Sequence, residues 1–273
     1  MENLHNLTTA PFVQSFINMA EEACRKGWHE SNGGNLSYRI REDELSAILP
    51  FLNETHVPKP LGVSVKELAG EYFIMTGAGR YLHNALKAPA KTFGIIRLDE
   101  RGENYIPLWG FENGHPTSEL TSHLLYHARK KVLTMGKNRV VYHCHPTNII
   151  ALSFILPAES RVLSEYLWGM MPECVLTFPE GVGVLEWMVP GTAEIATASV
   201  AQMEYFNAIV WACHGLFTCG SDFDQALGLA ETVEKAAEIC VKLFSMGHKT
   251  SPVLENAIKL AEAFKLELRR DFP

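Results

Sequence analysis

The sequence predicts a three-layer α/β/α fold, with helices covering both faces of a central mixed, largely antiparallel sheet. Strand-like segments alternate with amphipathic helical segments along the whole chain, and a short Asp- and Gly-containing turn at 99–102 predicts a hairpin between two of the strands. Neither glycine-rich loop, 32–35 or 76–79, runs directly into a helix, which disfavours a purely parallel sheet. No repeat, charge block or flexible linker divides the chain, so we expect one domain over residues 1–273.

The elements of the first half are expected in this order. Pro11 opens a helix that ends near Gly27, because Pro is favoured in a first turn and Gly after a last one. A turn-rich loop leads into a strand at 36–40, and residues 41–70, with three prolines, are expected to be irregular. Further strands are expected at 72–75, 93–98 and 105–109, and a helix at 118–132 with Thr117 as its cap.

The second half continues the alternation of strands and helices. Strands are expected at 139–143, 175–178 and 208–213, with a turn at 179–181. Helices are expected at 147–156, 159–170, from 191–192 to near 206, 223–246 and 253–268.

The composition limits the kinds of function. The chain has 273 residues, of which 47% are hydrophobic, enough for a sizeable core. Its net charge of −7 offers no general attraction for nucleic acid or an anionic membrane, so we expect neither as a partner. The apolar stretch at 149–156 is too short to span a bilayer.

The cysteines and the N-terminus predict a cytoplasmic protein. Six cysteines are scattered without a Cys-x-x-Cys pair, which is typical of reduced, mostly buried thiols. The first residues lack the basic and apolar regions of an export signal.

A His-Cys-His segment is the first group that could carry chemistry. On an extended strand the side chains of His143 and His145 point to the same face, where two imidazoles can bind zinc. His214, which is followed by glycine, is a possible third ligand. A His-x-His pair is a weak motif in a chain with 11 histidines, and spacing alone does not bring His214 to the other two.

A second group lies at the start of the helix expected at 118–132. The first backbone N–H groups of a helix favour a bound anion, and Glu119 falls in this turn. A carboxylate here is also what the helix dipole alone would favour. The two glycine-rich loops can bring backbone amides close to a phosphate without basic residues, although ordinary turns explain each of them equally well.

Taken together, these motifs resemble the class II aldolase/adducin-type family. The resemblance runs from about residue 12 to 247, and it rests on their order: Asn-Gly-Gly-Asn-Leu, Thr-Gly-x-Gly, Pro-Thr-Ser-Glu, His-Cys-His-x-Thr-Asn and a late His-Gly. The segments at 172–174 and 187–192 favour the members of this family that act on L-rhamnulose 1-phosphate.

The resemblance implies roles for individual residues in metal binding, catalysis and substrate binding. It implies one zinc ion per subunit, bound by His143, His145 and His214, with Glu119 as a displaceable ligand and as the acid/base. Glu173 corresponds to a carboxylate that a neighbouring subunit brings near the aldehyde end, in a homotetramer with sites between subunits. The substrate phosphate and the dihydroxyacetone part would be surrounded by Asn32, Gly34, Asn35, Gly79, Thr117 and Ser118.

The implied reaction is the reversible cleavage of L-rhamnulose 1-phosphate to dihydroxyacetone phosphate and L-lactaldehyde in rhamnose catabolism. Negative charge develops on the ketose fragment as C3–C4 breaks, and zinc acts there as a Lewis acid, so no Schiff-base lysine is needed. One position departs from the family: Ala78 stands where we expect a hydroxyl residue, so one phosphate hydrogen bond is missing or replaced. Segment 42–71 and the chain after Lys249 match poorly and receive no role.

Three alternatives stay open at this point. The same metal and glutamate would serve an aldolase or a 4-epimerase of another sugar phosphate. A zinc hydrolase would use three histidines to activate water, but it would not need two phosphate-binding loops. A structural module of the adducin type would not need to keep the three histidines and Glu119.

Overall fold

The computed structural model describes residues 7–55, 57–248 and 254–273 and places nine strands in one sheet. Their spatial order is β2-β5-β4-β3-β1-β6-β9-β8-β7. All neighbours pair antiparallel except β7 and β8, which confirms the mixed, largely antiparallel sheet. The strands are β1 (Asn35–Arg39), β2 (Lys59–Pro60), β3 (Tyr72–Thr76), β4 (Phe93–Leu98), β5 (Asn104–Gly110), β6 (Val140–Cys144), β7 (Gly183–Leu185), β8 (Ala208–Trp211) and β9 (Gly215–Gly220).

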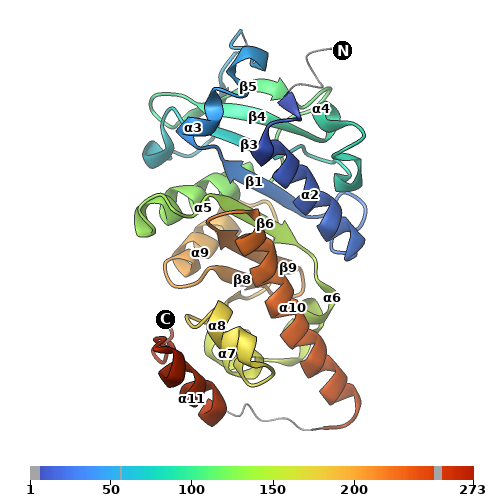
Figure 1. Ribbon diagram of the computed structural model, residues 1–273, viewed down its shortest axis with the longest axis vertical. Coiled ribbons are helices and arrows are strands. Elements are labelled where there is room, and N and C mark those ends of the chain that lie inside the picture. Colours follow the sequence, from blue (N-terminus) through green and yellow to red (C-terminus); the bar gives the residue numbers. More distant parts are fainter. Residues whose placement is uncertain (1–6, 56, 249–253) are drawn as a thin grey trace.

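Helices cover both faces of the sheet (Figure 1). Helices α2 and α10 lie together on one face, α5 and α9 pack on each other on the opposite face, and α11 lies beside α7 and α8 at the end far from β5. The helices are α2 (Pro11–Arg25), α3 (Glu42–Leu45), α4 (Pro89–Thr92), α5 (Leu120–Leu133), α6 (Thr147–Ile155), α7 (Ser160–Trp168), α8 (Pro172–Thr177), α9 (Ala193–Met203), α10 (Phe223–Ser245) and α11 (Leu254–Phe264), with short 3₁₀ turns at Leu49–Phe51, Lys66–Leu68 and Leu82–Asn84.

Strand β1 divides its side chains between the two layers with a period of two. Its apolar side chains join the large core that α2 and α10 cover: Leu36, Tyr38 and, just past the strand, Ile40. The alternate residues Asn35, Ser37 and Arg39 are polar and point to the other face, yet they are buried beneath α5. Because buried polar groups are costly unless they are hydrogen-bonded, each of these three must find partners there.

The neighbouring strand β6 continues the same alternation. Tyr142 and Cys144 belong to the core under α2 and α10, whereas Val141 belongs to the cluster between the sheet and α9. His143 follows Val141 on that second face, where its ring stacks on Phe217 with centroids 4.2 Å apart. The register of the sheet sets Asn35 of β1 opposite His143 of β6.

Most of the expected elements are confirmed within a few residues. The turn at 99–102 joins β4 to β5, with Asp99 accepting hydrogen bonds from the turn. The helix expected at 253–268 ends earlier, at Phe264, and Val253 lies outside the described residues. In segment 41–70, the described residues (41–55 and 57–70) form only short elements, as expected: α3, β2 and two 3₁₀ turns.

Two expectations are wrong, and two strands have no expected counterpart. Residues 175–178 do not form a strand: helix α8 spans Pro172–Thr177, because Pro172 favours a helix start and Cys174 and Val175 are buried where α8 packs on α7 and α10. Strands β7 and β9 were not predicted. Helix α5 begins at Leu120, so Glu119, not Thr117, occupies its N-cap position.

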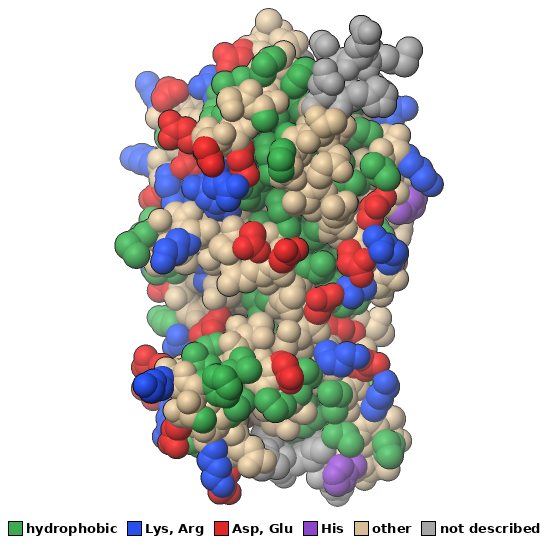
Figure 2. Space-filling view, in the orientation of Figure 1, with side chains coloured by type: hydrophobic (Ala, Val, Ile, Leu, Met, Phe, Trp, Pro, Cys, Tyr) green, Lys and Arg blue, Asp and Glu red, His purple; other side chains and the backbone are tan. Residues whose placement is uncertain are grey.

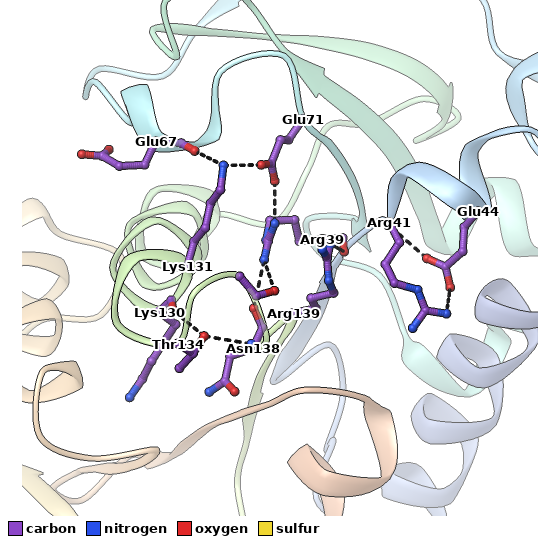
Figure 3. Close-up of polar contacts among 11 residues, drawn as sticks. Arg39, Arg41, Glu44, Glu67, Glu71, Lys130, Lys131, Thr134, Asn138 and Arg139 are labelled. Carbon is purple, nitrogen blue, oxygen red and sulfur yellow. Dashed lines mark hydrogen bonds and ion pairs between the residues drawn. The ribbon is translucent and has the colours of Figure 1, made fainter.

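Arg39 is the most buried cation of a polar cluster that ties β1 to the end of α5 (Figure 3). Its guanidinium donates to Glu71 at 2.9 Å and to the backbone carbonyl groups of Gly136 and Asn138. Lys131 also contacts Glu71, at 2.5 Å. Arg41 lies at the edge of the same cluster and pairs with Glu44 at 2.8 Å, but its side chain is 52% exposed, against 3% for Arg39.

On the face shown in Figure 2, described acidic and basic side chains are intermixed, and no broad area carries one sign of charge. Within the described residues, no helix is long and apolar enough to cross a membrane.

We predict that Arg39→Met and Arg41→Met differ strongly in stability. Arg39→Met removes a buried guanidinium, which leaves two carbonyl groups without this donor and leaves Glu71 paired with Lys131 alone. The variant should therefore lower the free energy of unfolding by about 3 kcal/mol. An exposed pair contributes about 1 kcal/mol or less, so Arg41→Met is the matched control. Urea unfolding at neutral pH measures both, and equal losses would contradict the role assigned to Arg39.

Candidate metal and acid/base site

The expected phosphate loop and the loop before α5 lie against each other. A β-bridge joins Gly77 to Pro116, Thr117 N donates to Thr76 O at 2.9 Å, and Ala78 N donates to His115 O at 2.9 Å. The hydroxyl oxygen of Thr76 also accepts from Leu36 N at the start of β1, at 3.3 Å. The tertiary structure therefore brings together three motifs that are far apart in the sequence.

Three histidines converge at one end of the central strands. His143 lies in β6, His145 follows directly after it, and His214 lies in the turn that connects β8 to β9. The Nε2 atoms of His143 and His145 are 3.3 Å apart, and one ring nitrogen from each of the three residues lies within 4.8 Å of the others. Cys213 takes a φ of +61° in this turn, which places His214 next to the pair.

The hydrogen bonds around these rings fit a metal ion. His143 Nδ1 lies 3.2 Å from Leu216 O, and His145 Nδ1 lies 2.6 Å from Glu30 Oε1. Since Nδ1 of each ring is bonded outward, Nε2 is the nitrogen left to bind a metal, as in many metal sites. His214 Nδ1 is buried and has no hydrogen-bond partner in the described part of the chain.

The protonation of these rings also suits metal binding. Burial, together with repulsion from His145 and His214, holds the pKa of His143 well below its usual value. Burial and the proximity of His145 lower the pKa of His214 to about 4. Both rings are therefore neutral near pH 7 and keep the lone pair that a metal needs.

Glu119 is a buried carboxylate next to the histidines. Although it occupies the N-cap position of α5, its side chain caps no backbone N–H group of that helix. Its Oε2 instead accepts from Asn35 Nδ2 at 2.9 Å and lies 4.0 Å from His143 Nε2. Burial raises the pKa of Glu119, and the hydrogen bond from Asn35 partly offsets that effect.

The first glycine-rich loop packs directly on the histidines. A Cβ atom at Gly33 would lie 2.8 Å from His145 Cε1. At Gly34, where φ is +70°, a Cβ atom would lie 2.3 Å from His29 Nδ1 and 2.7 Å from His143 O. Glycine is thus required for the close approach of this loop to the site.

The remaining expected site residues are placed as follows. Asn32, Gly79 and Ser118 are exposed, and Thr117 is buried beside Thr76. The amide of Asn35 is engaged on both sides, by Glu119 and by His123, so its contact with substrate stays a prediction. Glu173 is exposed on α8, in a surface cavity of about 560 Å³ with Lys26 and Trp28 that the three histidines and Glu119 do not line.

Sequence reasoning missed three buried polar residues that are linked to Glu119 through Asn35: Ser37, His123 and His127. Ser37 Oγ lies 2.6 Å from His123 Nδ1 and 2.8 Å from His127 Nε2. Two signals could have found them. The two histidines have the i, i+4 spacing of one helix face. Ser37 is one of the polar residues that alternate with apolar residues along β1.

Comparison with known proteins places this geometry in a family. Residues 14–241 match the family described as Class II Aldolase and Adducin N-terminal domain. The rhamnulose-1-phosphate aldolase of Mannheimia succiniciproducens is 41% identical over 265 residues, covering 96% of this chain and 97% of the relative. That of Escherichia fergusonii is 40% identical over 266 residues, covering 96% of each.

A solved structure agrees with the fold. The sugar-phosphate aldolase from Thermotoga maritima superposes with a TM-score of 0.74 at 27% identity, covering 87% of this chain and 96% of that one. The family match, the near full-length relatives and the shared fold all indicate the same assignment: this chain belongs to the class II aldolase and adducin N-terminal domain family.

Proposed function

We propose that this chain is an aldehyde-lyase that reversibly cleaves L-rhamnulose 1-phosphate into dihydroxyacetone phosphate and L-lactaldehyde in rhamnose catabolism. One observation carries the proposal: a buried carboxylate that caps no helix amide, Glu119, lies 4.0 Å from one of three converging imidazoles. The names of the two relatives, matched over nearly the whole chain, support this substrate.

The metal would be one zinc ion per chain, held by His143, His145 and His214. Three imidazoles form a typical protein ligand set for zinc in a catalytic site. When bound, the metal would supply Lewis-acid stabilisation of the negative charge that the ketose fragment develops. Gly33 and Gly34 keep the loop backbone close to two of these ligands, so the loop limits the space around the reacting carbons.

Glu119 would move the proton at C3. In the cleavage direction, a general base takes the proton of the C4 hydroxyl, the C3–C4 bond breaks, and C4 becomes the aldehyde carbon. The electron pair stays with the three-carbon fragment, and the Glu119 carboxyl group protonates it at C3. In the synthesis direction, the Glu119 carboxylate removes that proton. The raised pKa of Glu119 favours this work, because an acid/base is most effective when its pKa approaches the working pH.

The phosphate would bind where the loop at 76–79 meets the loop before α5. Gly79 has a φ of +65° and open space around its Cα, and Ser118 is exposed beside buried Thr117. Backbone amide groups together with hydroxyl and amide side chains can hold a phosphate without a basic residue. Asn32, Gly34 and Asn35 would complete the enclosure from the β1 side.

The alternatives are less well supported. A zinc hydrolase would leave the loop at 76–79, which is paired with the loop before α5, without a role. A structural module would not need three converging imidazoles or the lowered pKa of His214. An aldolase or 4-epimerase of another sugar phosphate would share this geometry, so a panel of ketose 1-phosphates with coupled detection of dihydroxyacetone phosphate distinguishes these substrates.

The assembly and the location belong to the proposal as well. Glu173 lies in a cavity that the three histidines of its own chain do not line, which agrees with a role at the site of a neighbouring subunit in a homotetramer. All six cysteines are free thiols and four are buried, which agrees with a reducing, cytoplasmic location.

We predict about one tightly bound zinc ion per chain, and that His214→Ala loses it. Removing one of three imidazole ligands weakens binding, while the fold is retained because His214 lies in a turn. Elemental analysis measures the metal, and circular dichroism checks the fold. His83→Ala, a substitution of an exposed histidine outside the site, is the control and should keep the metal. Active protein without a transition metal would refute the prediction.

We predict that Glu119→Gln abolishes most proton exchange at C3. Dihydroxyacetone phosphate in heavy water should exchange one C3 proton with the unsubstituted enzyme, and the variant should be slower by about 10²- to 10⁴-fold, the usual contribution of a general acid/base. The zinc content should be unchanged. Glu194→Gln, in the first turn of α9, is the matched control and should exchange normally. Normal exchange by zinc-replete Glu119→Gln would remove Glu119 from the mechanism.

We predict that two inactive chains complement each other. His143→Ala lacks a ligand and Glu173→Ala lacks the carboxylate that acts across the boundary, so mixed oligomers should contain some intact sites and regain activity. Mixing His143→Ala with His145→Ala is the control, because both changes damage the same half of the site. If subunit exchange is demonstrated and activity still does not return, Glu173 does not act across subunits.

A further inference from the structure

A continuous chain of buried hydrogen bonds runs from Glu119 into the interior between β1 and α5. Glu119 bonds to Asn35, Asn35 to His123, His123 to Ser37, and Ser37 to His127. Residues of β1 alternate in this chain with residues of α5 and its N-cap. The mechanism proposed above uses only the first of these five residues as an acid/base, and it leaves Ser37, His123 and His127 without a role.

The hydrogen bonds have only one consistent direction when Glu119 is a carboxylate. The carboxylate can only accept, so Asn35 donates through Nδ2 and its Oδ1 must accept. The partner of Oδ1 is His123 Nε2, which must therefore carry the proton. Its Nδ1 is then an acceptor for the Ser37 hydroxyl at 2.6 Å, and Ser37 Oγ accepts from His127 Nε2–H at 2.8 Å.

The opposite arrangement would be penalised at Glu119. If His123 carried its proton on Nδ1, its Nε2 lone pair would face Asn35 Oδ1. The amide would have to turn over, and its oxygen would then face the carboxylate of Glu119. In a buried site, two acceptors in contact cost more than in water, because no solvent screens them.

The rings of His123 and His127 are both neutral, as this series of hydrogen bonds requires. His123 and His127 are 0% and 1% exposed. Burial lowers the pKa of His123 to about 3, and burial followed by repulsion from His123 and nearby arginines holds the pKa of His127 well below its usual value. A neutral imidazole donates through one nitrogen and accepts through the other, so His123 can pass on the orientation set by Ser37.

We propose that Ser37, His123 and His127 are positioning residues, which hold the Asn35 amide in the single orientation that directs the Glu119 carboxylate toward the metal-binding histidines. They act through Asn35 and touch neither substrate nor metal. This inference rests on the proposed role of Glu119 as the acid/base at C3. It adds a fixed direction of hydrogen bonding, not a proton-transfer path, to that role.

The first test removes the middle of the chain with Ser37→Ala. Losing a residue that orients a catalytic group costs activity by about 10- to 100-fold in comparable sites. Turnover and C3 proton exchange should fall by the same factor, with KM and zinc content unchanged. Ser164→Ala is the matched control: Ser164 is also 0% exposed and hydrogen-bonded, but it lies in α7. Equal rates for the two alanine variants would overturn the proposal.

The second test combines Ser37→Ala with Glu119→Gln. If Ser37 acts only through Glu119, the added alanine should not reduce the residual rate of Glu119→Gln further, because coupled residues are not additive. A full additional loss would overturn the proposal. The single variants separate the two hypotheses. Normal exchange by Glu119→Gln defeats the acid/base role itself, whereas a slow Glu119→Gln with a fast Ser37→Ala defeats only the positioning role.

The third test needs neither activity nor metal. Nitrogen-15 NMR of the chelator-treated, metal-free protein near pH 7 reports which ring nitrogen of each histidine carries the proton. His123 and His127 should both be neutral with the proton on Nε2, and His123→Gln and His127→Gln identify their signals by loss. A proton on Nδ1 in either ring, or a charged ring, would overturn the proposal.

Discussion

The pairing of β1 with β6 in the middle of the sheet is the constraint on which the site depends. This register sets Asn35 opposite His143, with both side chains on the face that α5 covers. Glu119 at the start of α5 can then reach Asn35 at 2.9 Å and lie 4.0 Å from His143. A shift of one residue would turn Asn35 toward α2 and α10 and would separate the carboxylate from the imidazoles.

The same face of β1 is polar and buried, which explains why each of its residues forms at least two side-chain hydrogen bonds. Along this strand, Asn35 is hydrogen-bonded to the Glu119 carboxylate and Ser37 to two histidines. Arg39 is hydrogen-bonded to Glu71 and to two backbone carbonyl groups. Structural and chemical roles therefore lie side by side on one strand. The Arg39 end ties the strand to the loop that follows α5, and the Asn35 end lies at the candidate site.

Much of the fold could be predicted because its signals are local. The apolar runs of β3 and β4, the Asp99 turn and the proline that begins α2 can each be recognised from neighbouring residues in the chain. The failures have a common cause. Residues 175–178 have β-branched and aromatic residues typical of a strand, but contacts with α7 and α10 decide in favour of helix α8. Local propensity is weak compared with the burial that tertiary packing provides.

For the site, the sequence by itself determined which chemical groups are present: a His-x-His pair, a glutamate in a predicted first turn, and two loops of glycine and asparagine. Only the tertiary structure decided how they meet. It brought His214 to the pair through the hairpin of β8 and the unpredicted β9, and it turned Glu119 from the helix amides toward Asn35. It also joined Ser37, His123 and His127 in one chain. The reason is physical: spacing along the chain sets which face a side chain takes on its own element, whereas contacts between elements depend on sheet register and on burial across the whole core.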